Sequence, residues 1–548
     1  MSIYRQLLKH SGVYAVGEGF ARVASILLLP LYLHYLNPAD IAVIALTDVI
    51  TAVLGILVAR GITTAVSRYH FDEKYESSQH ALWVSGLVAL TAIALGLLIV
   101  TWLLRDLIAD GLLVDPDAGV DVETAASYVS LSLAVLAASL VGGYMTTYVR
   151  VLKRSTLYVV QQLITLLLKI GFNIKFIAFD ELGVLGFFYS GIIGGAFQGV
   201  VLLGVLFVGK PVRVIPEVFP KIFRFGWPFV VSGLATLSMH QADRYLLKQF
   251  LGLEQTGIYS LAHNIVMAVN TLLLLPFFQI WSVTIYEIDA TADRLQVFRR
   301  VFKYFVLTLF LVLLAVALFS ESILRIVSKP EFLPAASIIP IHCLAFNFYS
   351  LHALFSVPSM IHKRTGVVAL TAIVAAVVNV LANLVLIPQF GVYGAAVGSV
   401  MTYITYSFFG QWRYAKIERI GYPIGYVFCF IVFGAVLVLG WRYATSALIG
   451  GVVTESLSEG LKSLFHVCVG DRFEPEVLRD SALATANILI SAGIAAFCWL
   501  VALAIVLRGP ARELFEEGAA IRDWWERWRK HRRAQPSENA ESRSASTR

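Results

Sequence analysis

Charged residues are scarce in this sequence. Only 14% of its 548 residues are Asp, Glu, Lys or Arg, whereas 58% are apolar. A soluble globular domain carries about 25% charged residues. No polar linker or low-complexity run divides the chain before its C-terminal tail. These absences exclude a string of soluble domains and favour one membrane-embedded unit.

Cysteines are few, and the common catalytic motifs are absent. Three of the four cysteines lie inside apolar runs, so neither a disulfide framework nor a metal cluster is implied. The sequence has no G-x-x-x-x-G-K-[ST] phosphate loop and no H-E-x-x-H, C-x-x-C or G-x-S-x-G motif. We therefore expect neither a soluble catalytic site, nor a cofactor, nor a bound metal.

Long uncharged runs are the main feature that is present. Residues 81–104, 255–286 and 481–507 contain no Asp, Glu, Lys or Arg, and the longest such run is 365–412. A bilayer core needs about 20 apolar residues per helix, so the longest run predicts two helices folded near 388–391. The first helix is too long for a signal peptide and lacks a cleavage site, so we expect it to be retained. We predict an all-α membrane protein with fourteen spans, near 12–34, 41–65, 81–104, 125–148, 155–178, 183–208, 226–248, 256–285, 302–320, 335–360, 365–387, 391–412, 422–441 and 482–507.

The distribution of basic residues tests this span count independently. If the N-terminus is cytoplasmic, most of the 43 Lys and Arg residues fall in cytoplasmic segments, and the first long outer segment, 106–123, is acidic. The positive-inside rule then predicts an even number of spans with both termini in the cytoplasm. The net charge of +7 thus indicates membrane topology and no nucleic-acid partner.

Internal similarity predicts two lobes. Segment 36–46 (LNPADIAVIAL) matches segment 251–261 (LGLEQTGIYSL), and 183–186 matches 391–394 at the equivalent later position. Matches in the same order predict two parallel six-helix lobes related by an axis along the membrane normal. The predicted divisions are an N-terminal lobe at 1–209, a cytoplasmic linker at 210–225, a C-terminal lobe at 226–413, two extra helices with an outer loop at 414–507, and a basic tail at 508–548.

The tail has two parts. Apolar residues at helical spacing in 512–533 predict an amphipathic helix on the anionic inner leaflet. A solvated charged helix is the alternative for this segment. Residues 534–548 show no apolar periodicity, so we expect them to be disordered.

Charged residues inside the predicted helices are candidate functional residues, because each costs roughly 2.5–3.5 kcal/mol near the bilayer centre. Glu18 and Arg22 share one face of the first helix, where they also form an i,i+4 pair that could neutralise itself. Arg60 and Lys175 lie nearer helix ends, where snorkelling is the alternative. The remaining charged candidates are Asp48 on the second helix, Lys169 on the fifth, and Asp243 and Arg244 on the seventh. The polar candidates beside them are Gln162 and Asn173 on the fifth helix and His240 on the seventh.

The cations among these candidates predict an anion site, with the polar stripes beside them suited to hydroxyl-rich sugar. The buried histidines His240, His263, His342 and His352 are more typical of hydrogen-bonded interior residues than of proton carriers.

The sequence resembles the Wzx-type polysaccharide flippases of the multidrug/oligosaccharidyl-lipid/polysaccharide exporter superfamily. The resemblance covers the first twelve helices and lies in SGVYAVGEGFARVASILLLPLYLHYL (11–36), SRYHFDE (67–73) and DRYLLKQFLGLEQTGIYSLA (243–262). It implies two six-helix lobes around a V-shaped cavity, and a polyprenyl-pyrophosphate-linked oligosaccharide as the substrate. It also implies that basic residues receive the pyrophosphate. We rank Arg22 and Lys169 first, then Arg244, Arg60 and Lys175, with Gln162, Asn173 and His240 beside them.

Three functions follow as hypotheses. The first is a flippase of the bacterial inner membrane that moves undecaprenyl-pyrophosphate-linked units for O-antigen, capsule or exopolysaccharide synthesis, next to a glycan polymerase and chain-length proteins. Glu18, Asp243 and Asp48 are its candidate coupling-ion residues. The second is a multidrug or small-cation exporter of the same superfamily. The third is a membrane glycan polymerase or ligase.

Overall fold

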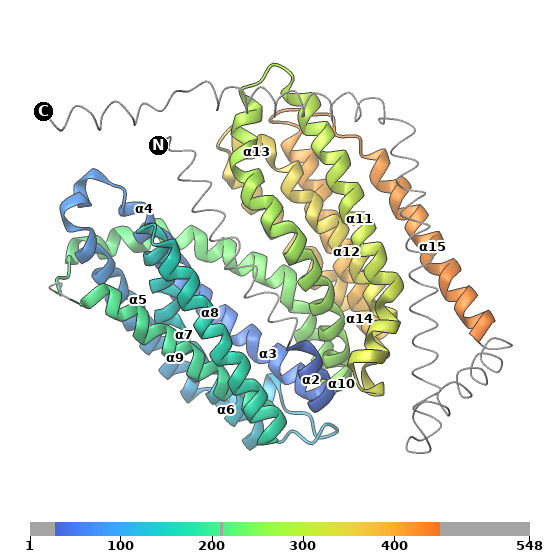
Figure 1. Ribbon diagram of the computed structural model, residues 1–548, viewed down its shortest axis with the longest axis horizontal. Coiled ribbons are helices and arrows are strands. Elements are labelled where there is room, and N and C mark those ends of the chain that lie inside the picture. Colours follow the sequence, from blue (N-terminus) through green and yellow to red (C-terminus); the bar gives the residue numbers. More distant parts are fainter. Residues whose placement is uncertain (1–27, 209–211, 450–548) are drawn as a thin grey trace, which may run out of the picture. The chain divides into compact units, whose positions relative to one another are not determined.

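Helices make up the fold of residues 28–208 and 212–449, which the computed structural model describes. All of the described residues belong to one compact unit. Figure 1 traces its elements: α2 (Leu29–Tyr35), α3 (Pro38–Gly55), η1 (Ile56–Arg60), α4 (Gly61–Tyr69), η2 (Glu73–Ser78), α5 (Gln79–Leu103), α6 (Arg105–Leu112), α7 (Val122–Val151), α8 (Ser155–Asn173), η3 (Ile174–Phe179), α9 (Val184–Phe207), η4 (Pro216–Val218), α10 (Phe219–Asp289), α11 (Arg294–Val327), η5 (Pro330–Phe332), α12 (Ala335–Phe355), α13 (Val357–Ile361), α14 (Thr365–Tyr414) and α15 (Gly425–Ile449).

The all-helical expectation is confirmed. Within 28–208 and 212–449 there is no β-strand, and the isolated bridge between Asp115 and Val120 is the only strand-like pairing found there. Nine helical stretches in this part of the chain are long and apolar enough to cross a membrane. The protein is therefore a multi-pass membrane protein. The total of fourteen spans stays a prediction, and both the start of the first predicted helix and all of 482–507 lie outside the described residues.

Two of these stretches contain a break where the sequence predicts a hairpin between two helices. α10 is interrupted at Gly252, whose φ is +79°, and α14 at Gly391, whose φ is +59°. Only glycine adopts such a left-handed conformation without a steric penalty from a Cβ atom. The predicted divisions between 248 and 256 and between 387 and 391 therefore coincide with real changes in backbone direction.

The described helices pack around two apolar cores. The first core is formed mainly by buried residues between Ala42 and Ile222. The second core is formed mainly by buried residues between Met239 and Val427, and it also includes Leu33 and Leu36 of the α2 segment. The end of the first predicted helix thus packs partly with the second half of the chain. The two-lobe layout and the domain limits drawn from the repeat stay predictions.

The two repeated segments contact one another. At the start of α3, Asn37 and Asp40 form a capping box in which each side chain accepts a hydrogen bond from the other's backbone N–H, at 3.0 and 2.8 Å. In the second repeat, Gly257 lies against this turn so closely that a Cβ atom there would be 1.7 Å from the carbonyl oxygen of Pro38. A hydrogen atom is therefore the only side chain that fits at position 257.

The break in α10 is capped by the predicted acidic outer loop. Asp115 Oδ2 accepts a hydrogen bond from the backbone N–H of Leu253 at 2.7 Å, while its Oδ1 accepts from the N–H groups of Asp117 and Ala118. Nearby, Gln249 Nε2 donates to the carbonyl oxygen of Gly111. One carboxylate thus organises its own turn and joins the loop before α7 to the middle of α10.

We expect Asp115→Ala to lower the unfolding temperature of the purified protein. The variant removes the acceptor for Leu253 N–H, and loss of a capping side chain costs about 1 kcal/mol. Thermal unfolding in detergent measures the effect, with Asp117→Ala on the same loop as the matched control. Equal unfolding temperatures for the two variants would contradict this role of Asp115.

Candidate functional site

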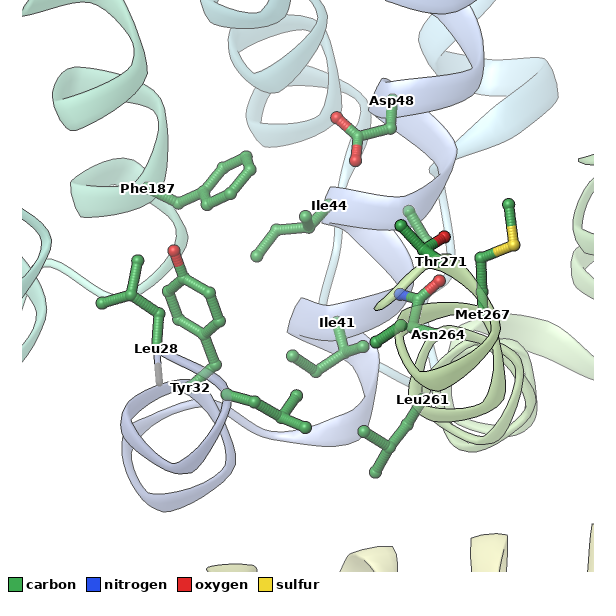
Figure 2. Close-up of a pocket in the computed structure, with 13 residues that line it drawn as sticks. Leu28, Tyr32, Ile41, Ile44, Asp48, Phe187, Leu261, Asn264, Met267 and Thr271 are labelled. Atoms are coloured by element: carbon green, nitrogen blue, oxygen red, sulfur yellow. The ribbon is translucent and has the colours of Figure 1, made fainter. Parts of the chain in front are cut away.

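A cavity of about 480 Å³ lies where α2, α3 and α9 face α10. Figure 2 shows its side chains, most of them apolar, with Asp48, Tyr32, Asn264 and Thr271 as the polar members that it labels. The lining residues are Leu28, Leu29, Tyr32, Ile41, Ile44, Ala45, Asp48, Phe187, Leu261, Asn264, Met267, Ala268 and Thr271. Its apolar walls and few polar groups are typical of small-molecule and lipid sites.

Asp48 is the charged residue in this lining. Its side chain comes from α3 and is exposed to the cavity. It interacts electrostatically with two predicted site cations, Arg244 on α10 and Lys169 on α8. The structure therefore places Asp48 within electrostatic range of both Arg244 and Lys169, although the three residues come from three helices.

Arg244 is almost fully buried, with 4% of its surface exposed, and reaches the cavity through a neighbour. Its terminal Nη2 donates to Asn264 Oδ1 at 2.8 Å, and Asn264 lines the cavity. Its Nε has no hydrogen-bond partner among the described residues. A buried guanidinium is costly unless it is paired, so the burial of the Arg244 charge is only partly compensated by these contacts.

Asp243 lies beside Arg244 but is saturated by donors. Its Oδ1 accepts the backbone N–H of Arg244 at 2.9 Å, and its Oδ2 accepts hydrogen bonds from Tyr259, and from Ser399 on α14 at 3.4 Å. Only 1% of Asp243 is exposed. The carboxylate is thus held inside the second core and does not line the cavity.

Lys169 and Asn173 belong to the face of α8 that meets α9 and α2. The aliphatic part of Lys169 passes over Gly194 of α9, where a Cβ atom would lie 2.5 Å from Lys169 Cγ. One turn later, Asn173 Nδ2 donates to the carbonyl oxygen of Lys169 at 2.7 Å, and its Oδ1 accepts from the hydroxyl of Tyr32 at 3.0 Å. Tyr32 lines the cavity. The hydrogen bonds of Asn173 therefore connect Lys169 to the cavity through Tyr32.

Gln162 and His240 occupy polar positions apart from the cavity lining. Gln162 Oε1 accepts from Gln198 Nε2 at 3.3 Å, between α8 and α9. His240 Nδ1 lies 2.7 Å from the hydroxyl of Tyr403 on α14. Both residues therefore have partners within their own half of the described chain.

Arg60 and Lys175 occupy different surroundings. Arg60 ends the π-helical turn η1 and packs against α10, where a Cβ atom at Gly233 would lie 2.7 Å from Arg60 Cδ. Lys175, on η3, forms an ion pair with Asp180 and has a side chain that is 56% exposed. The pair accounts for the charge of Lys175 at the end of its helix. Neither residue is part of the cavity lining.

Arg22 and Glu18 lie outside the described residues.

Several partners of the site were not predicted from the sequence. Tyr32 lines the cavity, and Tyr259 and Ser399 hold Asp243. Asn264, which also lines the cavity, does have a signal in the sequence, because it is a polar side chain within the uncharged run 255–286.

Solved structures with the same fold are transport proteins. The lipid II flippase MurJ in an inward closed conformation aligns with a TM-score of 0.67 and 12% identity over 90% of this chain and 98% of its own. An inward-facing multidrug resistance MATE family transporter of the MOP superfamily aligns at 0.54 and 16% identity, over 77% and 96%. A MOP superfamily transporter from Pyrococcus furiosus aligns at 0.52 and 14%, over 75% and 96%. These identities establish a shared fold.

The sequence itself places the chain in a family. No curated protein matches it. The model of the polysaccharide biosynthesis protein family, however, matches residues 7–281, a range that contains α2 to α9, most of α10 and all of the cavity lining. The predicted resemblance is thereby confirmed, and the chain belongs to the polysaccharide biosynthesis protein family.

Proposed function

We propose that the protein is a flippase that moves an undecaprenyl-pyrophosphate-linked oligosaccharide across the bacterial inner membrane by alternating access, with both termini in the cytoplasm. The family supports a role in glycan synthesis, and the shared fold with a lipid II flippase supports a lipid-linked substrate. O-antigen, capsule and exopolysaccharide units are all of this class. A glycan polymerase and chain-length proteins would act on the translocated product.

The observation that carries this proposal is the position of Arg244. Its guanidinium is buried, touches the cavity through Asn264 and retains an unpartnered Nε–H. A pyrophosphate entering a low-dielectric cavity needs positive partners already in place. Arginine meets this need because it stays protonated and donates in a planar fork that matches phosphate oxygens.

Asp48 contributes a negative charge to the proposed site. Because it interacts with both Arg244 and Lys169, it acts as their counter-ion until an anion arrives. Pyrophosphate and the Asp48 carboxylate would then compete for the same cations. In this proposal Asp48, with Glu18 and Asp243, belongs to the groups whose protonation or ion binding accompanies transport.

A multidrug or small-cation exporter is the second candidate, and Asp48 is the observation that favours it. The carboxylate is exposed within the cavity lining, where it would attract a cation directly. The fold shared with a MATE family transporter fits this alternative as well. The two candidates differ in the charge that the cavity must accept.

Depletion of the protein tests the proposal. We expect a lipid-linked oligosaccharide to accumulate on the cytoplasmic face, and the Arg22→Ala, Lys169→Ala double variant to block appearance of the glycan at the surface while protein abundance stays near normal. The single Arg22→Lys variant should retain part of the transport that Arg22→Ala loses, because lysine keeps the positive charge. Full glycan export by the double variant would show that these two cations do not hold the substrate.

A further inference from the structure

Two buried histidines in the second core have ring nitrogens without a hydrogen-bond partner in the part of the chain that the structure describes. Neither Nδ1 nor Nε2 of His342 has a partner among the described residues, and Nδ1 of His263 has none. His342 is fully buried and His263 is 3% exposed. An unsatisfied buried polar atom costs about 1–3 kcal/mol. The expectation of satisfied interior histidines holds for His352, which lies within 3.2 Å of hydroxyls on Thr371 and Tyr414, and fails for this pair.

The two histidines belong to a continuous group of polar side chains. The ring centroids of His263 and His342 are 5.2 Å apart, and those of His342 and Tyr259 are 4.8 Å apart. The hydroxyl of Tyr259 donates to Asp243. The group therefore runs from α12 to the Asp243–Arg244 pair on α10.

We propose that His263 and His342 form a proton-binding site coupled to anion binding at Arg244. This inference rests on the proposed function, because it requires an anionic substrate at the cavity. A proton that enters the pair occupies a free imidazole nitrogen and breaks no hydrogen bond of His342. The positive charge formed lies one ring away from the Tyr259–Asp243 contact.

The coupling arises from the charge of Arg244. Burial is the larger obstacle to a positive charge on His263 or His342, and the positive charge of Arg244 opposes protonation of either ring further. An anion bound to Arg244 cancels that charge and so makes protonation easier. By reciprocity, a proton on the histidines strengthens binding of the anion by the same factor.

The other titratable groups around His263 and His342 are less available to accept a proton than the unpartnered ring nitrogens. Asp243 already accepts hydrogen bonds from Tyr259, Ser399 and its neighbouring backbone N–H. His240 has a partner in the hydroxyl of Tyr403 on α14. Tyr349 on α12 packs against His240 and Tyr403. The vacant nitrogens of His342 and His263 are therefore the positions where an added proton is accommodated.

Calorimetric binding of inorganic pyrophosphate to the full-length protein in detergent tests the proposal. Titrations at neutral pH in two buffers of different ionisation enthalpy give the number of protons taken up per bound pyrophosphate. We expect the wild type to take up more protons than the His263→Phe, His342→Phe double variant, by a measurable fraction of a proton per bound pyrophosphate. The comparison removes the protonation of pyrophosphate itself, which is the same for both proteins.

Phenylalanine keeps the aromatic packing and deletes the unpartnered nitrogens, so the double variant should unfold at a temperature no lower than the wild type. His352→Phe is the matched control, because His352 is equally buried but has its own partners, Thr371 and Tyr414; its proton uptake should equal that of the wild type. If the double variant binds pyrophosphate with unchanged proton uptake, the histidine site is wrong and the anion site stands. If the wild type does not bind pyrophosphate, both the anion site and the coupling are wrong.

Discussion

Replacement of Arg244 by glutamine is expected to reduce surface glycan at least about tenfold. The change removes a buried positive charge while it keeps a donor group near Asn264, so the loss reports on charge. A hydrogen bond to a charged group contributes about 1.5–3 kcal/mol, and about 1.4 kcal/mol corresponds to a factor of ten. Surface glycan per unit of inserted protein is the measurement. Arg244→Lys should retain part of the activity because it keeps the charge without the planar fork.

The control for Arg244 is Arg325→Gln. Arg325 forms a partly exposed i,i+4 pair with Glu321 on α11, and such pairs contribute little to stability. Glycan export by the Arg325→Gln variant should therefore match that of the wild type. If the Arg244→Gln variant exports glycan normally, Arg244 does not bind the substrate. If the Arg244→Gln variant exports more glycan than the Arg244→Lys variant, the substrate is a cation.

Replacement of Gly257 by valine should have the largest effect on stability. A Cβ atom at this position would lie 1.7 Å from the carbonyl oxygen of Pro38. The nearest atoms all belong to the backbone of Pro38, so no flexible side chain can move aside. Overpacking typically costs about 1–3 kcal/mol, and here it would also push α10 away from α3. We expect a clear drop in unfolding temperature together with loss of transport.

Gly96 on α5 provides the comparison. No atom of the described residues lies within 4 Å of a Cβ built there, and alanine is a better helix former than glycine by up to about 1 kcal/mol. Gly96→Ala should therefore leave the unfolding temperature unchanged or raise it slightly. A Gly257→Val protein that unfolds like the Gly96→Ala protein would show that the α3–α10 turn contact is loose.

The positions of the helices were predictable because the bilayer imposes a length on uncharged runs. The uncharged run 81–104 became α5, which spans Gln79–Leu103, and the hairpin expected near 388–391 became the break at Gly391. The π-helical turns η1 and η3 were not predictable, since the residues that form them are ordinary helix formers. In the structure η1 packs against α10 and η3 packs against α9, and the local sequence does not specify these neighbours.

The candidate site was predictable in residue type but not in grouping. The cost of burying charge singled out Asp48, Lys169 and Arg244, and in the structure Asp48 interacts electrostatically with each of the two cations. The same reasoning selected Lys175, whose partner Asp180 on the following turn accounts for its charge outside the cavity. Hydrogen-bond partners from distant helices, such as Ser399 on Asp243, depend on tertiary packing and leave no local signal.

The contact between Asp115 and Leu253 joins residues that are 138 positions apart, and this separation has a consequence for how the protein is made. Chains leave the ribosome from the N-terminus, and earlier segments generally fold first. The Asp115 loop is therefore complete before Gly252 and Leu253 are synthesised. The acceptor on Asp115 is thus already in place when the backbone N–H of Leu253, which follows the break at Gly252, is made.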